Sequence, residues 1–320
     1  MKACPRIRRF ILITGMLGLG IPGAPGSTVV VSNRVAGNAP QTAQLLDTRG
    51  QPIPAGAWMQ VGTFGGRSAA EITALCAGGA SEVVAALSPF GDASSVGTGS
   101  GGSAGNIEFA ASAPLANSLS NVYAVVLNAA IITDAAEMLV LKLADGLPAD
   151  DPSGLEGYLA VHLRDAVPVF GTTAPNGLTT ATWLTGFEGW IAGRLPSGTP
   201  SGRRLENSDP DGDGLPNLVE YAFGSDAGDG GSRYCVELST DSGAPVLRSL
   251  RCSSDSRLGF VVETSATLAA DSWTPVPPSA TEVADPPTSP PAGYRWMEQA
   301  LPTGTGRLFV RLRVTLSEAP

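Results

Sequence analysis

Lysine and histidine are almost missing from this 320-residue chain. Lysine occurs only at Lys2 and Lys142, and histidine only at His162. Charged residues make up 15% of the chain, and its formal net charge is −9. Nucleic acids and anionic membranes are bound through basic patches, so this balance argues against both as partners. A Ser-His-Asp triad would have to use His162, which alternates with Val161 and Leu163 and is therefore expected on the solvent face of a strand.

The N-terminal apolar run is too short to span a bilayer. It covers Phe10 to Ile21, 12 residues, against the roughly 20 that a membrane helix needs. A basic start precedes it and small residues, Ala24 to Gly26, follow it, which is the layout of an export signal. We expect a signal peptide over residues 1–26, with an uncleaved anchor as the alternative. The Arg8-Arg9 pair leaves the general secretory and the twin-arginine routes both open.

Loss of that signal removes four positive charges and no negative ones, so the formal net charge falls from −9 to −13. A soluble acidic protein in a calcium-containing exterior fits this charge. The expected location is extracellular, periplasmic or at the cell surface, without membrane insertion once the signal has been removed.

Cysteine is scarce and does not follow a metal-binding spacing. Cys4 lies in the predicted signal, which leaves Cys76, Cys235 and Cys252. The last two lie on segments expected to be neighbouring strands. Outside the cytosol they could form a disulfide worth about 3 kcal/mol, or they could be two free buried thiols, and the sequence leaves both possibilities open.

The composition predicts a mainly β fold. Hydrophobic residues make up 43% of the chain, enough for a core, and 40 Gly with 26 Pro indicate many turns between short strands. We predict a β-rich N-terminal domain over 27–181, a junction of helix and calcium-binding loop over 182–230, and a C-terminal small β-sandwich-like domain over 231–320. The expected strands are 28–31, 57–64, 122–127, 138–143, 158–163, 234–238, 246–252, 258–264, 294–297 and 307–315. The expected helices are 68–87, split at Gly78-Gly79, then 182–195, and 218–223, which Gly224 ends.

One loop carries a clear chemical pattern. The segment Asp209-Pro210-Asp211-Gly212-Asp213-Gly214-Leu215-Pro216-Asn217-Leu218-Val219-Glu220 fills every position of D-x-[DN]-x-[DN]-G-x5-E. Calcium takes six to eight hard oxygen ligands. The expected ligands are the carboxylates of Asp209, Asp211 and Asp213, the carbonyl of Leu215, Asn217 directly or through water, and Glu220 as a bidentate clamp.

The surroundings of this loop differ from those of a paired EF-hand. Residues 196–208 are rich in Pro, Gly and Ser and cannot supply a long incoming helix. Pro216 stands at the eighth position, where paired loops exchange backbone hydrogen bonds, and proline has no N–H to donate. A lone structural ion is therefore expected, bound with the weak affinity of extracellular modules, about 10⁻⁴–10⁻³ M.

Asp209–Glu220 with Tyr221-Ala222-Phe223-Gly224 resembles a calcium loop of many secreted bacterial proteins. The segment is similar to thrombospondin type 3 repeats and to single dockerin-type loops, and the pattern after Phe260, closing on Arg307–Val314, is similar to the small β-domain that often ends such proteins. The resemblance implies calcium ligation and nothing catalytic. Dockerins carry two such loops and bind a cohesin, whereas this chain has one.

Other constellations are weaker. Gly101–Gly105 matches G-x-S-x-G, but it leads into an apparent strand rather than the helix of a nucleophile elbow. The Asp150-Asp151 pair lies between prolines, as in a turn. Trp58, Trp273 and Trp296 could form a sugar platform or pack in the core.

We therefore expect an exported non-catalytic protein, structural or adhesive, with calcium rigidifying the junction and a cell-surface or extracellular glycan or protein as partner. The alternative is a carbohydrate-binding accessory module of a secreted system.

Overall fold

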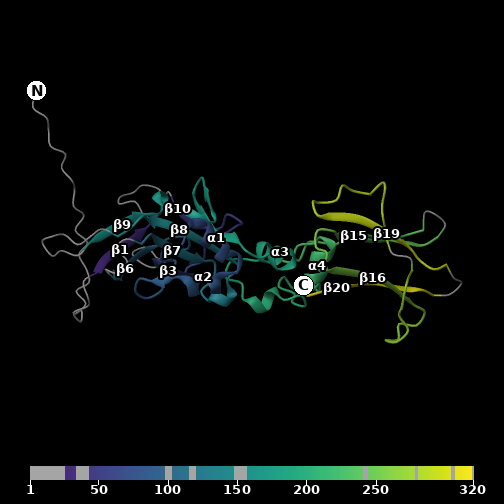
Figure 1. The fold of residues 1–320 in the computed structure, drawn as a ribbon. Coiled ribbons are helices and arrows are strands. Elements are labelled where there is room, and N and C mark those ends of the chain that lie inside the picture. The colour runs from purple at the N-terminus through teal and green to yellow at the C-terminus, as the bar shows by residue number, and fades with distance from the viewer. Residues whose placement is uncertain are drawn as a thin grey trace, which may run out of the picture.

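The computed structural model describes residues 26–33, 43–97, 103–114, 120–147, 157–240, 244–277, 280–303 and 307–318. The described chain is mainly β. Figure 1 shows one group of sheets toward the N-terminal side and a second group toward the C-terminal side, with two helices between them. The predicted signal peptide lies outside the described residues except for Gly26, which begins the first strand.

The N-terminal half contains three sheets. Their strands are β1 (Gly26–Ser32), β2 (Gln44–Leu46), β3 (Trp58–Thr63), β4 (Ser88–Pro89), β5 (Ser94–Ser95), β6 (Glu108–Pro114), β7 (Val122–Leu127), β8 (Glu137–Ala144), β9 (Tyr158–His162), β10 (Val167–Phe170), β11 (Thr172–Ala174), β12 (Gly177–Thr179) and β13 (Ala181–Thr182). The largest sheet has the order β10-β8-β7-β3-β4, with β13 beside β8 and β5 beside β3. The other two have the orders β6-β1-β9 and β11-β12-β2.

The central strand β7 explains how this half packs. All six of its residues are buried, and side chains alternate between the two faces of a strand. Val122, Ala124 and Val126 join the core shared with β1 of the β6-β1-β9 sheet. Tyr123 and Leu127 join a second core on the opposite face.

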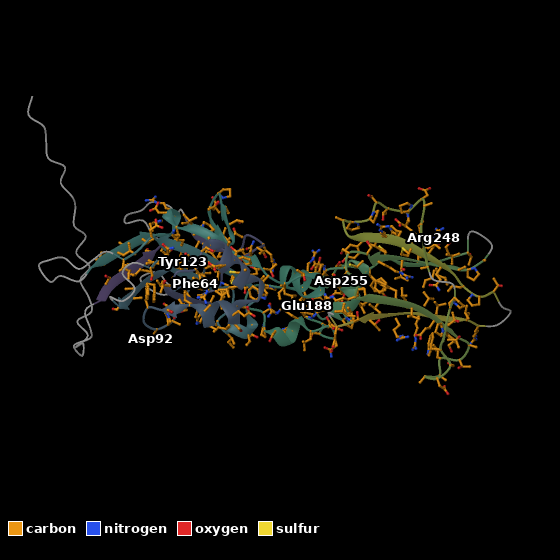
Figure 2. The ribbon with its side chains drawn as sticks, in the orientation of Figure 1. Phe64, Asp92, Tyr123, Glu188, Arg248 and Asp255 are labelled. Atoms are coloured by element: carbon orange, nitrogen blue, oxygen red, sulfur yellow. The ribbon has the colours of Figure 1, made fainter. Side chains whose placement is uncertain are left out.

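Two short helices cover that second face. They are α1 (Ala69–Ala77) and α2 (Ala80–Ala86), separated at Gly78-Gly79 as the sequence predicts. Ser68 and Glu71 form a capping box that fixes the start of α1. Phe64 meets Tyr123 edge to face, with ring centroids 5.2 Å apart, at this interface (Figure 2).

The C-terminal half holds two facing sheets, of order β14-β15-β19-β18 and β17-β16-β20. The strands are β14 (Val236–Ser239), β15 (Val246–Cys252), β16 (Leu258–Ser265), β17 (Thr274–Pro275), β18 (Thr281–Glu282), β19 (Tyr294–Ala300) and β20 (Phe309–Leu316). Leu247 and Val262 lie in the core between them. The predicted strands 246–252 and 258–264 match β15 and β16 closely, and the strand predicted at 234–238 begins two residues later than expected.

The segment between the halves packs mainly on the C-terminal sheets. It contains α3 (Gly186–Arg194) and α4 (Asn217–Phe223), and Gly224 ends α4 with a φ of 80°. Phe187, Ile191 and Tyr221 from these helices share one core with Cys252. The Arg257 guanidinium lies 2.9 Å from Glu188 of α3 and 2.8 Å from Asp255, so it ties α3 to the turn before β16; Figure 2 labels both carboxylates.

The structure bears on two expectations from the sequence, the disulfide between Cys235 and Cys252 and the absence of a membrane-spanning helix. Cys235 is an exposed free thiol and Cys252 a buried one, so the two do not form the disulfide that the sequence allowed. Strand β14 does place Cys235 near β15, because the Leu250 N–H donates to the Cys235 carbonyl. In the described part of the chain, no helix is long and apolar enough to cross a membrane.

Candidate metal centre

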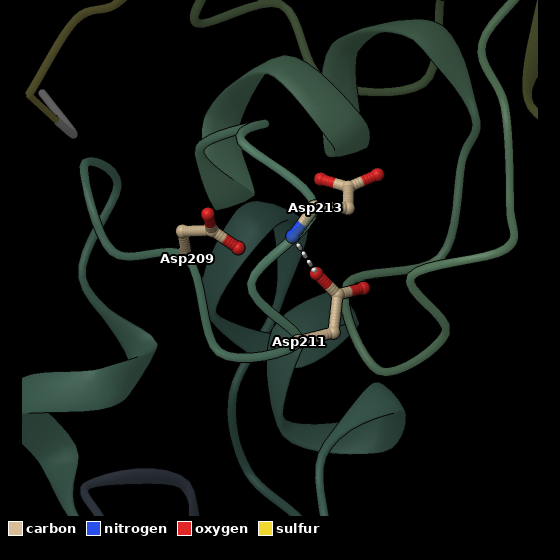
Figure 3. A group of neighbouring side chains, drawn as sticks. All are labelled: Asp209, Asp211 and Asp213. Carbon is tan, nitrogen blue, oxygen red and sulfur yellow. Dashed lines mark hydrogen bonds between the residues drawn. The ribbon is translucent and has the colours of Figure 1, made fainter.

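Three aspartates gather at one tight loop. One carboxylate oxygen from each of Asp209, Asp211 and Asp213 lies within 4.8 Å of the others (Figure 3). Gly212 and Gly214 have φ values of 79° and 93°, a conformation that a residue with Cβ adopts only with strain. The glycines of the sequence motif therefore make the turn that brings the carboxylates together, and such a cluster could hold a metal ion.

Backbone N–H groups fix the first aspartate. Gly212 and Gly214 donate to the two carboxylate oxygens of Asp209 at 2.8 Å and 2.9 Å. Burial by itself would raise the pKa of Asp209, but these donors outweigh it, and the pKa lies below its usual range. Asp209 is thus held as a carboxylate in a defined orientation.

Asp211 is in the opposite situation. Its Oδ1 accepts the Asp213 N–H at 3.2 Å, the bond dashed in Figure 3. Its Oδ2 is buried and has no hydrogen-bond partner within the described residues. Burial and the nearby charges of Asp213 and Asp209 raise the pKa of Asp211. Asp211 Oδ2 is therefore a buried oxygen that could coordinate a cation, because no protein donor satisfies it among the described residues.

Asn217 and Glu220 show the same shortage of donors. Both residues have 0% exposure although they carry polar side chains. Asn217 Nδ2 donates to the carbonyls of Arg203 and Leu205 at 3.1 Å and 2.8 Å, which fixes the amide and leaves Oδ1 without a donor. Glu220 Oε1 accepts from Ser225 Oγ at 3.3 Å, while Oε2 has no partner in the described part of the chain.

Glu220 lies outside the group of three aspartates, but the negative charges of two of them affect its pKa. Burial, followed by repulsion from Asp211 and Asp213, raises the pKa of the Glu220 carboxyl to about 7. A buried carboxylate near other carboxylates is unfavourable unless a cation offsets the charge. Three of the predicted carboxylate ligands thus lie in direct proximity, and the charges of two of them act on Glu220.

Leu215 takes part through its backbone. Its N–H donates to Asp213 Oδ1 at 2.8 Å, which closes the turn after the third aspartate. Pro216 then caps α4 without a side-chain hydrogen bond. The carbonyls of Ser208 and Glu206 instead accept the N–H groups of Asn217 and Leu218 at 2.8 Å and 3.0 Å. These backbone bonds explain how Asn217 and Glu220 become fully buried at the start of a short helix.

The next loop packs against the aspartates, which sequence spacing did not predict. A Cβ atom at Gly230 would lie only 3.5 Å from the Asp211 carbonyl oxygen and 3.6 Å from Asp213 Cβ. Arg233 lies 3.4 Å from Asp213 Oδ2. Asp226, in the same following loop, pairs with Arg194 at 2.9 Å. The glycine-rich run after α4 was the only sequence signal for this close approach.

The loop is also connected to the N-terminal half. A 3₁₀ turn at Ser201–Arg204 accounts for these contacts. The Ser201 N–H and hydroxyl donate to Asp134 at 3.0 Å and 2.7 Å, and Arg204 donates to the Asp134 carbonyl at 2.8 Å. On its other side, Arg203 donates to the Pro210 carbonyl at 2.7 Å. The acidic loop thus stands between contacts to both halves of the protein.

Among the described residues, the other candidates considered in the sequence do not assemble around a common centre. His162 Nδ1 accepts the Arg164 N–H at 3.2 Å and caps a 3₁₀ turn. Ser103 Oγ accepts from Asn106, and Gly101, Asp150 and Asp151 lie outside the described residues.

The three tryptophans of the possible sugar platform lie apart. Trp58 packs in the core under α1 and α2, and Trp296 on β19 is 3% exposed. Trp273, next to β17, is covered by the Arg311 guanidinium, 4.2 Å from the ring centroid. These three rings therefore do not share one sheet face.

The oxygen donors define the kind of ion that fits. Carboxylate and amide oxygens are hard ligands, which suit calcium, magnesium or manganese better than softer metals. No protein-family model matches the chain, and no curated protein and no solved structure gives a significant match to it.

Proposed function

We propose that this protein is an exported, non-catalytic calcium-binding protein of structural or adhesive type, in which one ion orders the junction between two β-rich halves. The proposal rests on three buried side-chain oxygens that have no hydrogen-bond donor among the described residues: Asp211 Oδ2, Asn217 Oδ1 and Glu220 Oε2. Asp211 is itself one of the three clustered aspartates. A divalent cation would satisfy all three oxygens together and offset the repulsion that raises the pKa of Glu220.

Calcium is favoured over magnesium by the number and type of donors. Magnesium requires near-ideal octahedral geometry and retains several waters, whereas calcium accepts six to eight oxygens in flexible arrangements. The loop offers four carboxylates, one amide oxygen and the Leu215 carbonyl. The Asp213 side chain is 6% exposed, and Glu220 and Asn217 are inaccessible, which favours protein ligands over waters.

The expected role of the ion is mechanical. Asp211 and its neighbours follow the 3₁₀ turn that contacts Asp134, while Glu220 lies within α4, the helix that packs on β15. Holding Asp211 and Glu220 on one ion would fix the loop between those two contacts. Without the ion, repulsion among the carboxylates would favour open loop conformations.

Calorimetry and limited proteolysis test the proposal together. Calcium titrated into the purified chain should bind at one site with a Kd of about 10⁻⁴–10⁻³ M, and it should slow cleavage within residues 196–230. Asp209→Asn, at the first position of the motif, where only aspartate fits, should abolish both effects. Asp285→Asn, at an exposed aspartate outside the loop, is the matched control and should leave both effects unchanged.

The outcomes separate binding from mechanical function. An absence of calcium uptake by the folded protein contradicts the ion site. Normal uptake with unchanged cleavage of residues 196–230 keeps the site but rejects the stiffening role. Uptake that survives in Asp209→Asn places the ion elsewhere in the chain.

A further inference from the structure

Arg251 on β15 is the single Lys or Arg side chain that is buried in the described part of the protein. It is 7% exposed, and it lies on the face of β15 that looks toward β16. Its Nε donates to Ser249 Oγ at 2.8 Å, and its guanidinium carbon lies 5.1 Å from the centre of the Phe260 ring. Its Nη2 has no acceptor among the described residues.

The positive charge of Arg251 also lacks a carboxylate partner. The described C-terminal half contains ion pairs for Arg248, Arg257, Arg295, Arg311 and Arg313, but not for Arg251. Burial lowers the pKa of Arg251 to about 10. Buried cations are normally paired, because an isolated charge is strongly disfavoured away from water.

The opposite residue on the neighbouring strand increases this imbalance. Arg251 pairs in register with Arg295 on β19, and like charges directly opposite each other destabilise a sheet. Arg295 is neutralised by Glu282 at 2.7 Å. The charge of Arg251 is the one that remains uncompensated at this position.

Arg251 lines a cavity of about 400 Å³ near one end of the two facing sheets. Phe260 and Leu258 line it from β16, and Met297 lines it from β19. Asp255 also reaches the cavity, but Arg257 at 2.8 Å and the Tyr221 hydroxyl at 3.1 Å already hold its carboxylate. The cavity thus combines an apolar patch of Leu258, Phe260 and Met297 with one unpaired cation, and the ion pair of Arg295 and Glu282 lines it as well.

We propose that this cavity binds a small organic monocarboxylate with an apolar body. The carboxylate would pair with the Arg251 guanidinium, and the apolar part would pack on Phe260 and Met297. A guanidinium presents a planar fork of donors that matches a carboxylate. Because Glu282 and Asp255 are already paired with Arg295 and Arg257, Arg251 supplies a single uncompensated positive charge, which matches a monocarboxylate better than a doubly charged anion such as phosphate. This site is separate from the acidic loop and does not depend on the proposed ion.

Hexanoate is a suitable probe, with hexanamide as its neutral counterpart. Calorimetry on the full chain should detect saturable binding of hexanoate, at least about tenfold tighter than that of hexanamide or inorganic phosphate. Hexanoate should also raise the unfolding temperature of the unmodified protein, and hexanamide should not. This second measurement needs no variant and therefore does not depend on how a variant folds.

Arg251→Met removes the charge while retaining an apolar side chain of similar length, and it should weaken hexanoate binding at least about tenfold. Arg248→Met is the matched control, because Arg248 lies on the same strand and pairs with Glu298 at 3.3 Å (Figure 2). It should leave binding unchanged. Equal binding of hexanoate and hexanamide, undiminished binding to Arg251→Met, or no saturable binding up to about 10 mM would each overturn the proposal. Preferential binding of phosphate would overturn the ligand class.

Discussion

Glu220→Gln should make the protein more stable in the absence of calcium and should lose most of that advantage in its presence. The folded pKa of Glu220 is about 7, against an ordinary value of 4.5, because of burial and of repulsion from Asp211 and Asp213. The folded state therefore holds this proton more tightly than the unfolded state. In the absence of calcium, Glu220 lowers stability progressively as the pH rises from 4.5 to about 7, and the loss is complete above that pH.

The magnitude follows from the size of the pKa change. Two to three pKa units correspond to about 3 kcal/mol of stability lost at pH 8. Glutamine removes that loss, but its buried amide N–H lacks an assured acceptor, which costs about 1 kcal/mol. We therefore expect Glu220→Gln to gain about 2 kcal/mol in the presence of a chelator at pH 8, which raises the Tm by about 4–8 °C. At pH 4 the gain should vanish, because the wild-type carboxyl is then protonated in both states.

Calcium should remove most of this advantage of the variant. At about 10 mM calcium, the wild type should gain about 1–3 kcal/mol by binding, whereas the variant lacks the bidentate ligand and should gain little. Thermal unfolding followed by circular dichroism, in chelator and in calcium at pH 4 and pH 8, provides the four conditions. A variant that is less stable than the wild type in chelator at pH 8, or that calcium stabilises as strongly as the wild type, would refute the reasoning.

Three further predictions concern other parts of the structure. Arg233→Ala should strengthen calcium binding about 2- to 5-fold, because it removes an exposed cation 3.4 Å from Asp213 Oδ2; weaker binding in calorimetry would show that Arg233 supports the loop instead. Gly79→Ala should destabilise the protein by about 1–3 kcal/mol in urea unfolding. Gly79 has a φ of 98°, and its new Cβ would lie 2.9 Å from Trp183 Nε1; an unchanged midpoint would contradict this packing. Cys235 should react with a thiol reagent in the native, unreduced protein, because it is exposed and free; an unreactive Cys235 that becomes reactive on reduction would indicate a disulfide.

Local sequence determined the loop and many of the elements, because each depends on residues close together in the chain. Gly212 and Gly214 allow the left-handed backbone that draws the aspartates together, and this requirement is visible in the motif. The Gly78-Gly79 pair separates α1 from α2, and Gly224 ends α4. The mainly β class follows from short apolar runs between turns. None of these features needs a distant partner.

Strand order depended on tertiary structure. Strand β1 lies between β6 and β9, antiparallel to the first and parallel to the second, although β9 is more than a hundred residues away in sequence. Alternation of apolar residues shows that a strand has a buried face, but it does not identify the strand's neighbours. The same holds for Cys235, which immediately precedes β14, and Cys252 on β15, because their separation depends on strand register and side-chain direction.

Burial of polar groups was decided by tertiary structure as well. The motif predicts Asn217 and Glu220 as ligands, but it does not predict that both are fully buried in the fold, where the Ser208 carbonyl accepts the Asn217 N–H and the Ser225 hydroxyl donates to Glu220. Arg251 reads in sequence as an ordinary strand residue, and only the facing sheet makes it a buried cation. Spacing along the chain determines which oxygens can converge. Their desolvation depends on the elements that pack over them. Desolvation shifts the pKa values of these groups and makes each charge unfavourable unless it has a partner.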